Sequence, residues 1–61
     1  MERERVGVLV VRVWHEDGST HFRARIVSRL DVDVDQQVVR HVGRPAEVSG
    51  IVQAWVDEFC S

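Results

Sequence analysis

The stretch VGVLVVRVWHEDGSTHFRARIVSRL, from Val6 to Leu30, decides the fold of this chain. It is rich in β-branched and aromatic residues and is interrupted once, by Asp17-Gly18, a pair typical of a tight hairpin turn. We therefore expect two antiparallel strands joined by a two-residue turn. The expected cross-strand pairs are Trp14 with His21, Arg12 with Arg23, Val10 with Arg25, Val8 with Val27, and Val6 with Arg29.

Side-chain alternation gives this hairpin two faces of different composition. The core face is expected to hold Leu9, Val11, Val13, Phe22, Ala24 and Ile26. The candidate interaction face holds Val6, Val8, Val10, Arg12, Trp14, His21, Arg23, Arg25, Val27 and Arg29. A slip of one residue would bury Arg23 and Arg25, so burial favours this assignment. A three-residue loop with a bulge is the alternative turn.

The remaining chain predicts a third strand and one helix. The third strand is expected from about Gln36 to Val42, after a polar turn at Asp31, Asp33 and Asp35. Its inward face is ambiguous, because Val38 and Val42 would bring Arg40 inward, whereas Val39 would bring Gln37 and His41. These elements predict an α+β domain over residues 1–61, a three-stranded antiparallel meander with a C-terminal helix packed on one sheet face (β-β-β-α).

The helix is predicted to start at Pro45, which suits the first helical position. Its buried stripe is expected to contain Val48, Ile51, Val52, Trp55 and Phe59, widened by Val56 and Cys60. Gly50 breaks the local helix preference, so we expect it to allow close approach to the sheet. Residues Glu47, Gly50, Gln53 and Asp57 should face water.

Composition limits the function classes. The chain has 61 residues, a formal net charge of −2 and eight basic residues, all arginine, which is typical of a GC-rich bacterial genome. One cysteine, Cys60, excludes an intrachain disulfide and indicates a reducing, cytoplasmic compartment. No apolar run is long enough to span a membrane. No phosphate-binding glycine loop, nucleophile motif or acid pair is present, and so small a chain is not expected to enclose a pocket, so we expect no enzyme activity.

Metal and cofactor sites are not predicted. The aspartates at 31, 33 and 35 have the spacing of a calcium loop, but Gln36 and Val42 stand where glycine and glutamate are required. The three histidines, His15, His21 and His41, are too dispersed for a zinc signature.

The interaction face leaves three interpretations open: solvated arginines, a protein partner, or DNA or RNA bound through arginine and Trp14. A chain this small cannot hide both apolar sides of its first strand, so the leading expectation is a non-catalytic, homodimeric protein-interaction module. Acidic residues of the partner would then neutralise the arginines. The strand order, with Glu16-Asp17-Gly18 in the first hairpin, resembles the N-terminal domains of HicB-type antitoxins and the Apetala-type DNA-binding domains of plants. The resemblance is topological and assigns no site residue.

Overall fold

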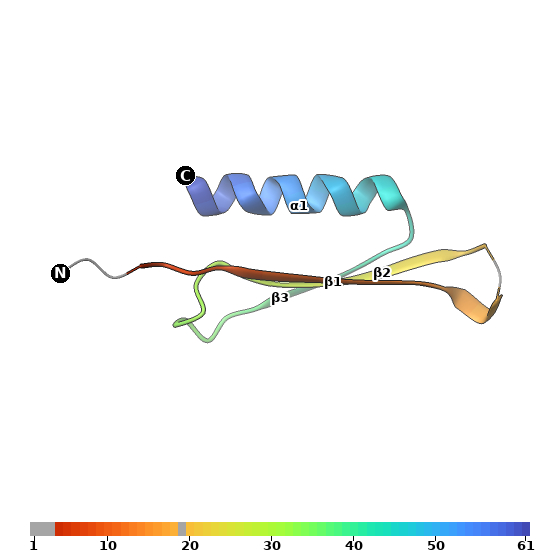
Figure 1. Cartoon of the computed structure of the whole chain (residues 1–61), viewed down its shortest axis with the longest axis horizontal. Helices are drawn as coiled ribbons and strands as arrows, with labels where there is room; N and C mark the ends of the chain where they lie inside the picture. The colour runs from red at the N-terminus through yellow and green to blue at the C-terminus, as the bar shows by residue number, and fades with distance from the viewer. Residues whose placement is uncertain (1–3, 19) are drawn as a thin grey trace.

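The computed structural model describes residues 4–18 and 20–61, and it has three strands followed by one helix. The strands are β1 (Val8–His15), β2 (Phe22–Arg29) and β3 (Val38–Val42), and the helix is α1 (Pro45–Cys60). They form one antiparallel sheet in the order β1-β2-β3, so β1 and β3 are its edges. α1 lies along one face of this sheet (Figure 1), which confirms the predicted β-β-β-α fold.

The first hairpin closes through a longer turn than the predicted one. The N–H of Glu16 donates to the carbonyl of His21 at 3.0 Å, and a 3₁₀ turn covers Glu16–Gly18. Asp17 and Gly18 have φ angles of 52° and 68°, so this pair does reverse the chain. His21 was expected to lie in the second strand, but it lies in the loop that precedes β2.

The predicted cross-strand pairs are therefore wrong by two residues. The observed pairs on the interaction face are Val8 with Arg29, Val10 with Val27, Arg12 with Arg25, and Trp14 with Arg23. Because side-chain direction repeats every two residues, this shift leaves each strand residue on its predicted face. The pattern of apolar residues is the same in both registers, so burial alone could not distinguish them.

The connection from β2 to β3 is the polar turn expected from its aspartates. The Asp31 carboxylate accepts a hydrogen bond from the backbone N–H of Asp33 at 2.9 Å, and Val34 N–H donates to the Asp31 carbonyl at 3.1 Å. Asp35 lies 3.9 Å from the guanidinium of Arg29. β3 then pairs with β2 from Val38 onward.

The register of β3 settles which of its residues face the helix. Ala24 lies opposite Val42, and Ile26 lies opposite Arg40. The side chains of Val38, Arg40 and Val42 are therefore on the α1 side of the sheet. The first of the two predicted alternatives is correct, and an arginine accompanies the valines on this face.

α1 starts at Pro45 as predicted and packs through the expected stripe. The partly buried side chains of this helix are Val48, Ile51, Val52, Trp55 and Phe59. Val56 and Cys60 are exposed, so the stripe is narrower than predicted. The expectation for Gly50 is also wrong, because a Cβ atom there would have no neighbour within 4 Å. Gly50 is exposed, in agreement with its predicted position on the water-facing side of the helix.

The C-terminal end of α1 is held by the segment that precedes β1. Arg5 donates a hydrogen bond to the carbonyl of Phe59, and its guanidinium lies 4.4 Å from the centroid of the Phe59 ring. Trp55 stacks on the same ring at 5.9 Å. Gly7 allows this packing, because a Cβ atom there would lie 2.9 Å from Phe59 Cδ2. A cation at a helix C-terminus also complements the helix dipole.

The buried core is small. Ala24 and Ile26, both on β2, are the fully buried apolar residues among those described, each 1% exposed. The radius of gyration is 13.9 Å, against about 10.5 Å for a compact domain of 61 residues. The accessible surface is 5011 Å², whereas a compact protein of 7.0 kDa exposes about 4,000 Å². The fold therefore leaves about 1,000 Å² more surface in water than a compact monomer would.

Candidate interaction surfaces

The outer edge of β1 has no strand paired with it among residues 4–18 and 20–61. Glu16 and His21 continue the β1–β2 register and are joined by a hydrogen bond, so the even-numbered residues of β1 direct their N–H and C=O groups toward β2. The odd-numbered residues Leu9, Val11 and Val13 must then direct theirs outward. This edge is open to pairing with another strand.

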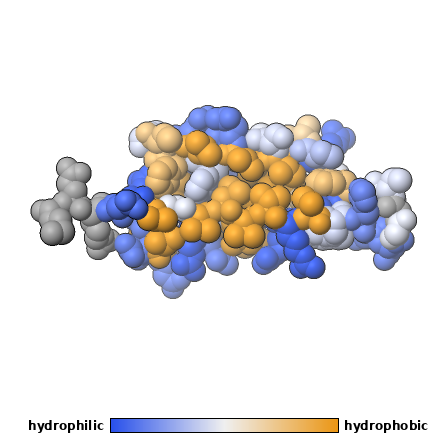
Figure 2. All heavy atoms as spheres, in the orientation of Figure 1, coloured by the Kyte–Doolittle hydropathy of each residue, from blue (hydrophilic) through white to orange (hydrophobic). Residues whose placement is uncertain are grey.

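Apolar side chains accompany this open edge on both faces of the sheet. On the α1 side, Val11 and Val13 are exposed because α1 packs over β2 and β3. On the opposite side, Val8 and Val10 are exposed as well, Val10 to 57%. Figure 2 shows the resulting continuous apolar area on the face where β1 lies nearest the viewer. An eight-residue strand, VLVVRVWH, thus has both an unpaired backbone and apolar flanks.

The other edge of the sheet has a different character. β3 has five residues, VVRHV, and places Arg40 among the side chains facing α1. A short edge strand with an inward-facing charge resists the addition of a further strand, because pairing would bury that charge. Val38 on this strand is 54% exposed, nearly the same fraction as the 55% of Val13 on β1. The two edges therefore expose similar valines but differ in length and charge.

The sheet face opposite α1 brings together the predicted arginines; we call it the open face. Arg12 and Arg25 are directly opposite each other on β1 and β2. Like charges at opposed positions are destabilising, and neither residue has an ion pair within the described ranges. The Arg12 guanidinium lies 5.4 Å from the centroid of the Trp14 ring, a cation–π contact that orients it.

The other two arginines of the open face are paired with loop carboxylates. Arg23 Nε lies 3.3 Å from Glu16 of the first turn, and Arg29 lies 3.9 Å from Asp35 of the second loop. All four groups are substantially exposed, so these ion pairs contribute little to stability. Their effect is to reduce the positive charge at the two ends of the open face and leave it concentrated at Arg12 and Arg25.

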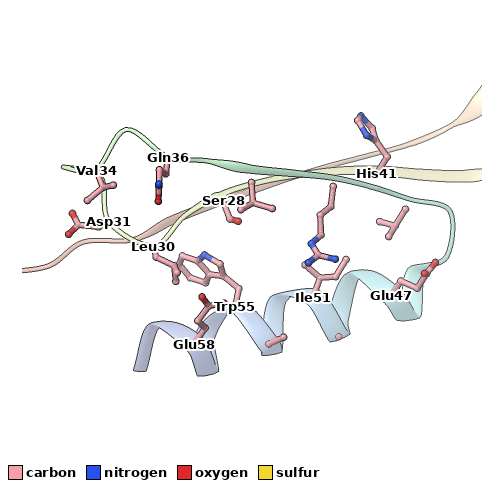
Figure 3. A pocket seen from close by; sticks show the side chains of 15 residues that line it. Ser28, Leu30, Asp31, Val34, Gln36, His41, Glu47, Ile51, Trp55 and Glu58 are labelled. Carbon is pink, nitrogen blue, oxygen red and sulfur yellow. The ribbon is translucent and has the colours of Figure 1, made fainter. Parts of the chain in front are cut away.

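A cavity of about 830 Å³ opens between α1 and the β3 side of the sheet (Figure 3). Trp55 projects into this space from the helix, and its Nε1 is buried without a hydrogen-bond partner within the described chain. Arg40, Glu47 and Glu58 also line it. This space is a groove open to solvent, formed because the single helix does not cover the full width of the sheet, so it does not contradict the expectation that so small a chain would enclose no pocket.

The structure places most of the predicted interaction residues together. The residues of that set that lie on β1 and β2 and share the open face are Val8, Val10, Arg12, Trp14, Arg23, Arg25, Val27 and Arg29. Val6 precedes β1, where its carbonyl accepts a hydrogen bond from Val32, and His21 is in the loop. Val39 and His41 were missed, because their face depended on the undecided register of β3.

Within residues 4–18 and 20–61, no helix is long and apolar enough to cross a membrane. The same described residues hold no group of three or more histidine, cysteine, aspartate or glutamate side chains arranged to bind a metal. No protein-family model, curated protein or solved structure matches the chain.

Proposed function

We propose that this chain is a small, non-catalytic interaction module whose first partner is a second copy of itself, joined through β1. The observation that carries this proposal is the edge strand with unpaired backbone groups and exposed valines on both faces. Pairing of two such edges would satisfy the backbone groups and remove apolar surface from water at the same time. A cytoplasmic location fits the lone, exposed thiol of Cys60.

The exposed area of the chain is large enough for an interface with a second copy. The chain exposes about 1,000 Å² more than a compact protein of its mass, and a stable interface buries about 800 Å² on each partner. The contrast between the two edges supports β1 over β3 as the proposed site, because β3 is shorter and carries the inward-facing Arg40.

The backbone geometry restricts how the two strands can pair. Antiparallel pairing of the outward groups joins odd-numbered residues to odd-numbered residues, which places both helices on the same face of a six-stranded sheet. Two registers pair seven of the eight residues of β1, one with Val11 on the two-fold axis and one with Arg12 on it. The second would place two arginines directly opposite each other, so we assign the first. Arg12 then lies opposite the partner's Val10, and Leu9 lies opposite the partner's Val13.

The oligomeric state is the direct test. Light scattering of the wild-type chain at micromolar concentration should give twice 7.0 kDa. A folded, stable species of 7.0 kDa would refute the proposal. The matched variants are Val13→Lys on β1 and Val38→Lys on β3, which change equally exposed valines on the α1 side of the two edges. We expect the first to shift the equilibrium to monomer and the second to leave the dimer intact.

A crosslink tests the register without depending on the stability of a monomer. In the assigned register Val11 pairs with itself at a Cα–Cα distance of about 5.5 Å, which lies within the range of a disulfide. Val11→Cys combined with Cys60→Ser should therefore oxidise to a covalent dimer under mild conditions. Val38→Cys in the same background is the control and should remain reduced. Equal crosslinking of the two variants would contradict pairing through β1.

A further inference from the structure

We propose that the open face of the paired sheet binds single-stranded nucleic acid, with Arg12 and Arg25 of both copies holding the phosphates. This inference rests on the proposed dimer for the number of arginines involved, whereas the basic pair itself belongs to each chain. It identifies the class of molecule that the module would bind.

The charges of this chain are segregated by element. The three strands contain five arginines and no aspartate or glutamate, and four of these arginines are on the open face. α1 contains Glu47, Asp57 and Glu58 and no basic residue. The formal net charge of −2 therefore conceals a positive sheet face and a negative helix. An anionic partner would be attracted to the sheet and repelled by the helix.

The centre of the open face has a positive charge that the described chain does not neutralise. Arg12 and Arg25 lie directly opposite each other without a carboxylate between them, whereas Arg23 and Arg29 have ion pairs at the periphery. A phosphate between the two guanidinium groups would convert their repulsion into attraction. Arginine suits this role because its planar fork donates two parallel hydrogen bonds to a phosphate.

Dimerisation through β1 would double this site. With Val11 on the two-fold axis, each Arg12 lies diagonally across the axis from the partner's Arg12, at a Cα–Cα distance of about 7–8 Å. The four unneutralised guanidinium groups then form one row across the middle of the six-stranded sheet, in the order Arg25, Arg12, the partner's Arg12, the partner's Arg25. This row is extended, which suits a chain of phosphates better than a single small anion.

The apolar residues of the open face favour a single strand over a duplex or an acidic peptide. Val10 is 57% exposed, and Trp14 and Val39 are each 38% exposed, beside the arginines. Exposed bases can lie on such side chains while the arginines hold the backbone. A duplex hides its base faces, and an acidic peptide supplies charge without flat apolar groups.

Fluorescence anisotropy with labelled oligonucleotides tests the proposal. The probes are a mixed-sequence single strand of about twelve nucleotides as DNA and as RNA, its duplex, and poly-glutamate. Four phosphate contacts predict a slope of about −2.8 for log affinity against log salt, or a loss of about 50-fold between 50 and 200 mM salt. We expect single strands to bind more tightly than the duplex and poly-glutamate.

Two double variants separate the open face from overall charge. Arg12→Gln with Arg25→Gln should weaken single-strand binding by at least about tenfold and abolish most of the salt dependence. Arg40→Gln with Arg44→Gln removes the same charge outside the open face and should leave the affinity within about twofold of wild type.

The outcomes distinguish this inference from the proposed dimer when light scattering is performed on the same samples. A dimer that binds no single strand, that prefers the duplex or poly-glutamate, or that loses affinity equally in both double variants would overturn the nucleic-acid proposal alone. A monomer that binds single strands with a slope of about −1.4, half the predicted value, would support the arginine pair and overturn the dimer.

Discussion

Gly50→Ala should stabilise this protein, although glycine inside a helix often marks a close contact. Gly50 lies in the middle of α1, is exposed at the edge of the cavity, and has an ordinary helical φ. A Cβ atom at this position would meet nothing within 4 Å. Alanine is favoured over glycine in a helix by about 1 kcal/mol, and no steric cost opposes this gain. The free energy of unfolding should therefore rise by about 1 kcal/mol.

Thermal denaturation followed by far-UV circular dichroism measures this change. An unfolding entropy of about 2.1 cal/mol/K per residue predicts a rise in Tm of about 7–8 °C for a chain of this length. All variants must be compared at one protein concentration, because association makes Tm depend on concentration.

Gly7→Ala is the matched control for the same chemical change. Its Cβ atom would lie 2.9 Å from Phe59 Cδ2 and 3.0 Å from Trp55 Cζ2, so the packing at the end of α1 would have to shift. We expect this variant to lose about 1–3 kcal/mol. An unchanged or lower Tm for Gly50→Ala would refute the reasoning, because it would mean that the helix approaches another surface at Gly50.

Three further predictions concern the sheet and its first turn. Arg25→Gln should raise the free energy of unfolding in urea by about 0.2–1 kcal/mol, because it removes the repulsion with Arg12; a loss of stability would show that the two charges do not repel. Ile26→Ala should cost about 2–5 kcal/mol, whereas the exposed Val38→Ala should have a small effect, and equal costs would contradict a core centred on β2. Gly18→Ala should cost about 1–2 kcal/mol through its φ of 68° alone, since its Cβ atom would meet nothing, and Gly18→Asn should recover part of this loss in the same urea titration.

The faces of the elements could be predicted from the sequence better than their pairing. Alternation of apolar and polar residues assigns Leu9 and Arg12 to opposite faces in any register that keeps the core buried. The step from a two-residue turn to the observed closure between Glu16 and His21 changes every pair but no face. The turn type could therefore be determined only from the backbone structure, because the two registers bury the same residues.

Other features depended on distances between elements. The width of the sheet relative to one helix decides that Val56 is exposed and that a cavity forms beside Trp55. The approach of loop carboxylates to Arg23 and Arg29, but not to Arg12 and Arg25, also depends on how the two loops fold. The spacing of residues along the chain does not indicate these contacts. The sequence therefore predicted which arginines share the face, but not which of them are neutralised.

The different lengths and charges of the two edges have a consequence for the growth of an assembly. A sheet with two receptive edges can add copies without limit and form a fibre. Here the two β1 strands would pair with each other at the two-fold axis. Both outer strands of the dimer would then be copies of the short β3 with its Arg40. Addition would therefore stop at two chains. The same charge that makes β3 a poor partner would keep the paired sheet finite at high protein concentration.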